Sequence, residues 1–434
     1  MPGTSLFGKV LAKFPARCRP ALYFETLSNI GTGGYMTVFP ISLVVLESLL
    51  AADLWYQMLL AMMFFGSNLL SPLVAYSGQR VPMRLLVIVP NILVAALLLF
   101  TLVPRSGPLL FTLLVGGSFV VRVFPRVAEM NMFRVLYPAS HRSMAIGWTK
   151  AISAFSGLTI TLLSWWWFAY RPDLYAWLYC LIAVQLCAAA WFYSRIPVQR
   201  HSIFLNPDPI SPMRAFVAGS RVIFSDRRFL TYQMGFAAAG IANHMGLYLV
   251  PKILNEDVEV SATRVAFIVA VLPTALVIVS SPLWGRFLDS RTPMFGRGLF
   301  NTMQVAAFVL YGLGGLWSEF WPFVIGATLH AFSNGGGAIN WLTGSMYFAR
   351  RDQVSLYNGI HVFMTGLRGL IGPPLALFLF VGEQRINSFH FEGCDLGPFV
   401  FFVCASLSAL GCLTMLVLHV TDTGPRDESY RHAS

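Results

Sequence analysis

Twelve long apolar runs divide this chain of 434 residues, and they restrict its fold more than any other feature. A helix needs about 20 residues to cross the hydrocarbon core of a bilayer, and the runs are of that length or longer. A membrane β-barrel would instead alternate apolar and polar residues with a period of two. We therefore predict an all-α polytopic membrane protein with twelve transmembrane helices, near residues 20–46, 53–76, 83–104, 108–133, 143–169, 174–194, 229–251, 262–286, 294–317, 320–348, 355–381 and 397–420.

The composition supports a membrane location. Hydrophobic residues make up 56% of the chain and charged residues 11%, whereas soluble proteins are about 25% charged. With the N-terminus placed inside, 21 of the 30 lysines and arginines fall in inner segments or within one turn of the inner ends of spans, 5 in outer loops or at the outer ends of spans, and 4 in span interiors. Because inner loops are enriched in these residues, we expect a multi-pass protein of the cell membrane, the inner membrane in a Gram-negative source, with both termini cytoplasmic. The same distribution explains the net charge of +11 without a nucleic-acid partner.

The two halves of the chain share short motifs at a nearly constant offset, which indicates an internal duplication. The matches are 71–73 with 281–283, 82–83 with 293–294, and Ser143, Gly147 and Gly157 with Ser355, Gly359 and Gly369. We therefore expect two pseudo-symmetric six-helix bundles, 1–194 and 229–420, joined by a cytoplasmic linker, 195–228, and followed by a cytoplasmic tail, 421–434. Within the linker, residues 211–224 are amphipathic and predict a helix along the membrane face. Parallel repeats of this kind describe a secondary transporter.

The segment from Gly285 to Arg291 reads GRFLDSR and precedes the ninth predicted span. It resembles the loop signature of the major facilitator superfamily, Gly-x-x-x-Asp-Arg/Lys, although Ser290 delays the basic residue by one place. The resemblance implies alternating access and an inner gate formed by Gly285, Asp289 and Arg291, in which the carboxylate and the arginine latch the inner ends in the outward-facing state. In the first half, Gln79 stands where the equivalent aspartate is expected.

Charged side chains lie inside several predicted spans, where an ionised group costs at least about 2.5 kcal/mol if it faces lipid. Arg122, Arg126 and Glu129 recur at helical spacing and therefore share one face of the fourth span. The resemblance implies that the first, fourth, seventh and tenth spans line a central cavity, with the second, fifth, eighth and eleventh beside them. The polar residues on these spans are Glu25, Asn29, Arg122, Arg126, Glu129, Lys150, Asn243, His244, His330, Asn334, Asn340, His361 and Arg368.

We expect Glu129 to pair with Lys150 and Glu25 to pair with Arg126, which leaves Arg122 and Arg368 as less compensated charges near the midplane. Four basic residues then oppose two carboxylates, and guanidinium groups bind carboxylate and phosphate well. This pattern predicts transport of a small organic anion. The candidate substrate-binding residues are Arg122, Arg126, Asn243, His244, Asn334 and Arg368, and Glu25, Glu129 and Lys150 are candidates for ion pairing or coupling. The alternative is that these charges only hold helices together.

Proton coupling is a further hypothesis, with Glu25 as its best carboxylate and the three histidines of these spans as other titratable groups. A structural role is the alternative for each histidine. The sequence has no HxxxH, HExxH or Cys/His cluster, so we predict no metal site and no cofactor. No nucleophile, base and metal-ligand set comes together, so we predict no enzyme and no catalytic residues.

Glycine and proline predict where helices bend. Gly31, Gly33 and Gly34 interrupt the first span, and Pro125 is expected to kink the fourth. Asn334 and three following glycines predict a gating joint in the tenth span, and Gly366, Gly369 and Gly372-Pro373-Pro374 a flexible eleventh span. Close helix packing is the alternative for each glycine.

The sequence leaves other functions open. An exporter of hydrophobic or drug-like compounds is the second candidate, since 14% of the residues are aromatic. A non-transporting membrane sensor or enzyme is a third. A primary pump is excluded because GTSLFGK (residues 3–9) only imitates a phosphate-binding loop: Val10 replaces the required Ser or Thr. We expect a monomer whose partners are a small-molecule substrate, the lipid bilayer and, for a coupled transporter, protons.

Overall fold

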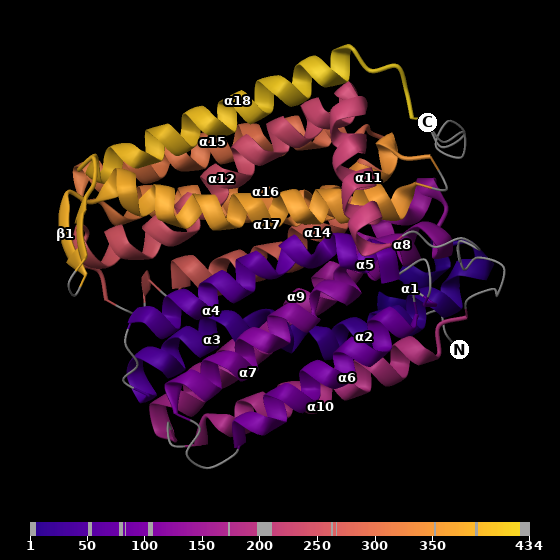
Figure 1. Cartoon of the computed structure of the whole chain (residues 1–434), viewed down its shortest axis with the longest axis horizontal. Coiled ribbons are helices and arrows are strands. Elements are labelled where there is room, and N and C mark those ends of the chain that lie inside the picture. Colours follow the sequence, from indigo (N-terminus) through magenta and orange to yellow (C-terminus); the bar gives the residue numbers. More distant parts are fainter. Residues whose placement is uncertain are drawn as a thin grey trace.

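The computed structural model is almost entirely helical, and its helices run side by side in two groups (Figure 1). It describes residues 6–50, 54–77, 81–82, 84–102, 107–171, 174–197, 211–261, 264–265, 267–350, 353–386 and 389–425. The N-terminal bundle is drawn in indigo to magenta and the C-terminal bundle in pink to yellow. The twelve predicted spans are all present as helical segments, six in each bundle.

Short helical pieces make up several segments of the N-terminal bundle. α1 (Leu6–Ala12) and η1 (Ala16–Cys18) precede the first span, which consists of α2 (Arg19–Gly33), η2 (Gly34–Thr37), α3 (Val38–Val44) and η3 (Val45–Leu49). The second span consists of α4 (Leu54–Gly66), η4 (Ser67–Leu70) and α5 (Ser71–Ser77), and the third of α6 (Leu85–Leu99) and η5 (Phe100–Leu102). The fourth consists of α7 (Pro108–Val121) and α8 (Val123–Leu136), the fifth is α9 (Ala139–Tyr170) and the sixth is α10 (Ala176–Ser194).

Longer helices build the C-terminal bundle. They are α12 (Arg227–Glu256), η8 (Phe267–Val271) with α14 (Leu272–Leu288), α15 (Pro293–Trp317), α16 (Phe320–Phe348), α17 (Val354–Phe380), and η9 (Gly397–Phe399) with α18 (Val400–Val420). The helix expected over residues 211–224 is α11 (Pro212–Ser225), and the Ser211 hydroxyl caps it by accepting from the backbone N–H of Arg214.

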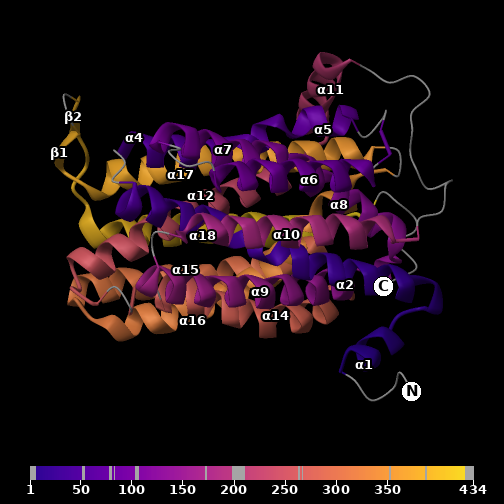
Figure 2. The same ribbon diagram turned by 90° about the horizontal axis from the view of Figure 1, so that it is seen from below.

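The sequence did not predict the two short strands between α17 and α18. β1 (Glu383–Ile386) and β2 (Phe389–Glu392) pair antiparallel, with Glu383 opposite Glu392. Figures 1 and 2 show this hairpin at one end of the molecule, and α11 and both chain ends at the other. We call these the hairpin end and the terminal end.

Eight helices in the described residues are long and apolar enough to cross a membrane by length and composition. They are 85–102, 108–136, 139–167, 176–194, 267–288, 293–317, 354–380 and 397–420. The first two spans are divided into shorter pieces, and α12 and α16 carry more polar residues.

Two predicted interruptions are present. α2 ends at Gly33 and continues as the tighter η2. The fourth span breaks at Arg122, between α7 and α8, three residues before Pro125. A proline lacks the N–H that would bond one turn back, so a break immediately before it is expected.

The tenth and eleventh spans are not interrupted at their glycines, because α16 and α17 are continuous helices in this state; a gating joint there stays a prediction. The glycines of both helices serve close packing in this state. A Cβ on Gly335 would lie 2.1 Å from the hydroxyl of Ser280, and one on Gly336 would lie 2.2 Å from the ring of Phe300. Gly369 likewise packs directly on Phe65.

Small residues bring the two bundles together at two crossings. In the first, α9 meets α14: a Cβ on Gly147 would lie 2.4 Å from the Ser281 carbonyl oxygen, and one on Gly285 would lie 2.6 Å from that of Ser143. In the second, α5 meets α17, where the Ser71 hydroxyl donates to the Gly359 carbonyl at 2.7 Å. Small residues four apart allow such close approach. The repeat found in the sequence relates Ser281 to Ser71 and Gly147 to Gly359, so the two crossings are equivalent.

Candidate functional site

The N-terminal bundle holds a basic cluster around the break between α7 and α8. Arg122 lies at the break and its Nη1 is 3.5 Å from Oε1 of Glu129, two turns further along the same segment. The same Nη1 donates to Oδ1 of Asn91 on α6 at 2.9 Å. The guanidinium also lies 5.8 Å from the ring centroid of Tyr35. Arg122 is therefore ion-paired and hydrogen-bonded inside protein and does not face lipid.

Arg126 and Lys150 complete this cluster. Arg126 donates from Nη1 to Oδ1 of Asn68 at 2.5 Å. Lys150, on α9, interacts electrostatically with Glu129, Arg122 and Arg126. Within the described residues Glu129 has its ion pair with Arg122, so the expected Glu129–Lys150 pair is replaced by one within a single span.

Glu25 has a different partner from the one expected. The Tyr137 hydroxyl donates to Oε2 of Glu25 at 2.5 Å, while Arg126 points to Asn68. Glu25 is only 1% exposed. A phenol therefore supports this carboxyl group, and the predicted Glu25–Arg126 pair is wrong.

A second basic cluster lies in the C-terminal bundle. Arg368 on α17 donates to the Phe236 carbonyl at 3.1 Å and to the Thr365 hydroxyl at 3.2 Å. Its guanidinium carbon lies 4.4 Å from the centroid of the Phe236 ring on α12. Arg297 on α15 lies over the same ring at 4.0 Å. Arg297 was expected among the charges of the inner segments, and it instead lies in the interior of the bundle.

Aromatic and amide side chains surround this second cluster. His361 is fully buried, sits edge-on to Phe236 at 4.7 Å and hydrogen-bonds Gln233 through Nδ1 at 3.0 Å. The indole of Trp341 donates to the Thr365 hydroxyl at 2.9 Å. Arg122 and Arg368 thus belong to two clusters, one in each bundle, where the sequence analysis expected a single set.

Two other predicted residues line a small cavity in the C-terminal bundle. Asn243 and Asn334 bound a space of about 110 Å³ together with His330. Oδ1 of Asn243 lies 2.6 Å from Nε2 of His330 and accepts from Gln304 at 3.3 Å. The neighbouring His244 faces the other bundle, where its ring meets Phe65 at 5.2 Å.

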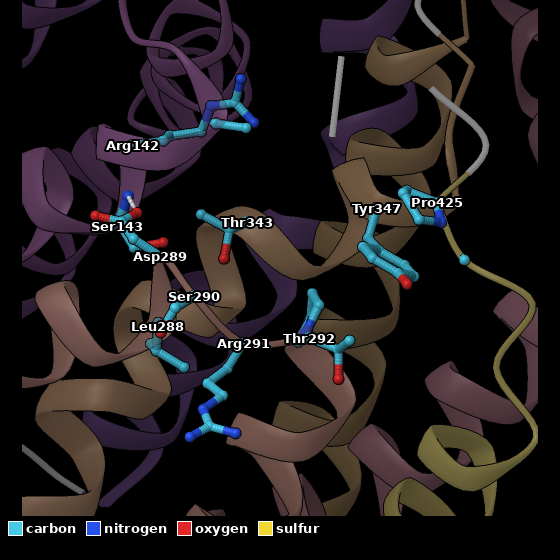
Figure 3. A pocket seen from close by; sticks show the side chains of 13 residues that line it. Arg142, Ser143, Leu288, Asp289, Ser290, Arg291, Thr292, Thr343, Tyr347 and Pro425 are labelled. Carbon is cyan, nitrogen blue, oxygen red and sulfur yellow. Dashed lines mark hydrogen bonds between the residues drawn. The ribbon is translucent and has the colours of Figure 1, made fainter. Parts of the chain in front are cut away.

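The predicted gate residues lie at the terminal end, beside a cavity of about 300 Å³ (Figure 3). Asp289 follows the last residue of α14 and accepts from the backbone N–H groups of Ser143 at 2.7 Å and Met144 at 3.1 Å. This carboxyl group therefore joins the two bundles. Burial raises its pKa to about 7, and the bonds from Ser143 and Met144 act in the opposite direction.

Arg291 does not take part in that contact. Its guanidinium lies over the rings of Phe287 and Phe295, at 5.6 and 5.5 Å, and Figure 3 shows it directed away from Asp289. Both rings belong to its own bundle, so in this state Asp289 alone makes the expected connection. Gln79, the corresponding residue of the first half, lies outside the described residues.

Further hydrogen bonds between the bundles gather toward the terminal end. Asn131 on α8 donates to the Ser355 hydroxyl at 3.0 Å and accepts from the Asn358 amide at 2.9 Å. Together with Asp289 and the Ser71–Gly359 bond, they hold the terminal end closed. Asn131 could not be predicted as a contact between the bundles, because its partners lie more than 220 residues away along the chain.

Two bundles of six helices, closed against each other at one end and related by an internal repeat, define the major facilitator superfamily fold. The chain is similar to the crystal structure of a Major Facilitator Superfamily (MFS) transporter, FucP, in the outward conformation, with a TM-score of 0.64 and 10% sequence identity over 95% of this chain and 98% of that one. No family model and no curated protein matches the sequence. The resemblance seen in the sequence is thereby confirmed for the fold, that of a multi-pass membrane protein.

Proposed function

We propose that this chain is a member of the major facilitator superfamily and a secondary active transporter that moves a small organic anion by alternating access. The observation that carries the proposal is the excess of positive charge inside the described spans. Arg122, Arg126, Lys150, Arg297 and Arg368 lie in span interiors, and the carboxylates there are Glu25 and Glu129. An anion that enters between the bundles compensates this charge, and guanidinium forks match carboxylates in geometry.

The N-terminal cluster is the proposed point of first contact. Among the described residues, Glu129 forms its ion pair with Arg122, and the hydrogen-bond partner of the Arg126 side chain is the neutral amide of Asn68. Asn68, that partner, packs against Gly366 of α17, so Arg126 sits at the boundary between the bundles. A substrate carboxylate bound by Arg126 is therefore in reach of both halves.

The closed terminal end indicates which side of the membrane the proposed transporter faces in this state. Because lysine and arginine concentrate in the segments on that side, we propose that the terminal end faces the cytoplasm, with both termini and the linker 195–228 there. The closed gate then describes an outward-facing state of a monomer in the cell membrane. Glu25, deeply buried and held by Tyr137, is the proposed coupling carboxyl group if protons drive transport.

Uptake by proteoliposomes tests this proposal. Radiolabelled mono- and dicarboxylates should enter vesicles that contain the protein, faster with an imposed proton gradient if Glu25 couples the two. Arg126→Gln should reduce uptake at least about tenfold, since a hydrogen bond to a charged group contributes about 1.5–3 kcal/mol. Arg264→Gln, which alters an arginine stacked on Phe320 at the hairpin end, is the matched control. Full uptake by the Arg126 variant would contradict the proposal.

One observation favours export of hydrophobic compounds as the second candidate. Phe39 and Phe64 stack at 4.3 Å, and Phe119 meets Phe64 edge-on at 4.9 Å. Phe65, next to this cluster, reaches His244 across the bundle boundary. Protein-dependent efflux of lipophilic dyes from the same proteoliposomes, without uptake of any organic anion, would support the exporter.

A further inference from the structure

Arg297 is a buried cation without a counter-charge in the described structure. Its side chain starts one turn into α15 and is only 7% exposed. It forms no hydrogen bond with the described residues, and its Nε is fully enclosed. Arginine stays protonated in proteins, so this charge is held inside the bundle with an aromatic face as its principal contact.

A second buried cation lies on the same ring. Arg368 is 8% exposed, and its Nε also has no hydrogen-bond partner. The guanidinium carbons of Arg297 and Arg368 lie 4.0 and 4.4 Å from the centroid of the same ring, that of Phe236. The two cations are therefore near neighbours. Two like charges this close in a low-dielectric interior repel each other strongly.

The described carboxylates of the C-terminal bundle lie too far from Arg297 and Arg368 to neutralise their charges. They sit at the ends of helices or in the connections between them, at Asp226, Asp257, Glu259, Asp289, Glu319, Glu392, Asp395 and Asp422. The walls of the site are instead aromatic and amide groups, His361, Gln233 and Trp341 among them. The described protein therefore does not neutralise the two arginines.

The surroundings also make room for both side chains. A Cβ on Gly240 would lie 2.4 Å from Cδ of Arg368, and one on Gly337 would lie 3.3 Å from Nη1 of Arg297. Glycine at these two positions lets the guanidinium groups approach Phe236. The arginines are therefore packed in fixed places and are not free to extend toward the membrane surface.

We propose that a halide-sized monovalent anion is bound between Arg297 and Arg368 at the edge of the Phe236 ring. The ring faces attract the cations, while the positive ring edge favours an anion. The enclosed, aromatic surroundings suit a small, weakly hydrated ion. This anion is a resident part of the C-terminal bundle, separate from the substrate cluster around Arg126. It compensates Arg297 and Arg368, so the charge left for the proposed substrate is that of Arg122, Arg126 and Lys150 against Glu25 and Glu129.

Thermal unfolding of the full-length protein in detergent tests the site. When chloride or bromide replaces gluconate at constant ionic strength, the melting temperature should rise with the logarithm of the halide concentration, by about 2 to 5 °C at a concentration about 100 times the Kd. Arg297→Met and Arg368→Met should abolish this shift. Arg264→Met, which removes a cation stacked on an aromatic ring at the hairpin end, should preserve it.

A bromide derivative gives a measurement that needs no variant. Crystals of the wild-type protein grown in bromide should show an anomalous peak beside Arg297 and Arg368. If Arg297→Met fails to fold, Arg297→Lys should fold and weaken the apparent chloride affinity at least about tenfold, because it keeps the charge and loses the fork. The proposal is overturned if halide does not raise the melting temperature, if both methionine variants retain the shift, if only formate or acetate produces it, or if bromide is located elsewhere.

Discussion

Asp289 gives the sharpest test of the closed terminal end. This carboxyl group accepts two backbone N–H bonds across the boundary between the bundles. In the open state it would regain water and lose both bonds. Asp289→Ala removes the acceptor, so we expect the population to move toward molecules whose terminal end is open.

The size of the effect follows from the hydrogen bonds and from burial. Because burial raises the pKa of Asp289 to about 7 in the closed state, the group is protonated there at pH 5–6 and its two oxygens still accept from Ser143 and Met144. Each hydrogen bond to a neutral group contributes about 0.5–1.5 kcal/mol, so at this pH the loss of both bonds changes the balance by about 1–3 kcal/mol, which shifts the equilibrium about 5- to 150-fold. Arg291→Ala is the control. Since the guanidinium of Arg291 lies over aromatic rings of its own bundle, its loss should change the equilibrium less than about fivefold.

The same carboxyl group makes the closure depend on pH. Burial raises its pKa to about 7 in the closed state, and exposure in the open state returns it toward 3.8. The closed state therefore binds the proton more tightly, so it is favoured at low pH, and this advantage is lost as the pH rises from about 4 through about 7. Asp289→Asn is neutral and still accepts a hydrogen bond, so its closure should not vary over this range.

Distances between spin labels at Ala16 and Thr421 report on the opening. Both residues are exposed at the terminal end, one in each half of the chain. The exposed Cys187 and Cys394 are first replaced by serine, since the other four cysteines are enclosed or partly enclosed in helices. An unchanged distance distribution in Asp289→Ala, or a pH response that persists in Asp289→Asn, would refute the reasoning.

Three further substitutions test the packing. Gly147→Ala places a methyl group against a backbone carbonyl of α14, so it should lower the melting temperature by the equivalent of about 1–3 kcal/mol; Gly117→Ala, with its nearest neighbour at 3.8 Å, should leave the melting temperature unchanged or raise it. Tyr137→Phe leaves the buried Glu25 without its donor and should destabilise the protein by about 1–3 kcal/mol in thermal unfolding; equal stability would show that the bond contributes nothing. Asn131→Ala removes two bonds across the boundary and should lengthen the label distance without abolishing folding.

The spans were predictable because length and apolar content are local properties of the chain. Breaks at Gly33 and before Pro125 were predictable for the same reason, since each depends on the backbone chemistry of one residue. The run from Asn334 to Gly337 shows the limit of this reasoning. Its glycines meet Ser280, Phe300 and Arg297 from other helices, and the sequence does not reveal which neighbours a helix face will meet.

The polar partners could not be predicted for a related reason. Helical spacing placed Arg122, Arg126 and Glu129 on one face, but which acceptor each arginine reaches depends on side-chain direction and on neighbouring helices. Arg297 was missed because a charge one turn from a helix end is expected to extend to the membrane surface. Its side chain instead lies over Phe236, which comes from a different helix.

The paired crossings of small residues limit how the protein can move. α9 touches α14 at Gly147 and Gly285, and α5 touches α17 at Ser71 and Gly359. Two bodies joined closely at two points keep one easy rotation, about the line through both points. The second crossing thus leaves the two bundles one rotation axis, so opening at one end of the molecule should be mechanically coupled to closing at the other.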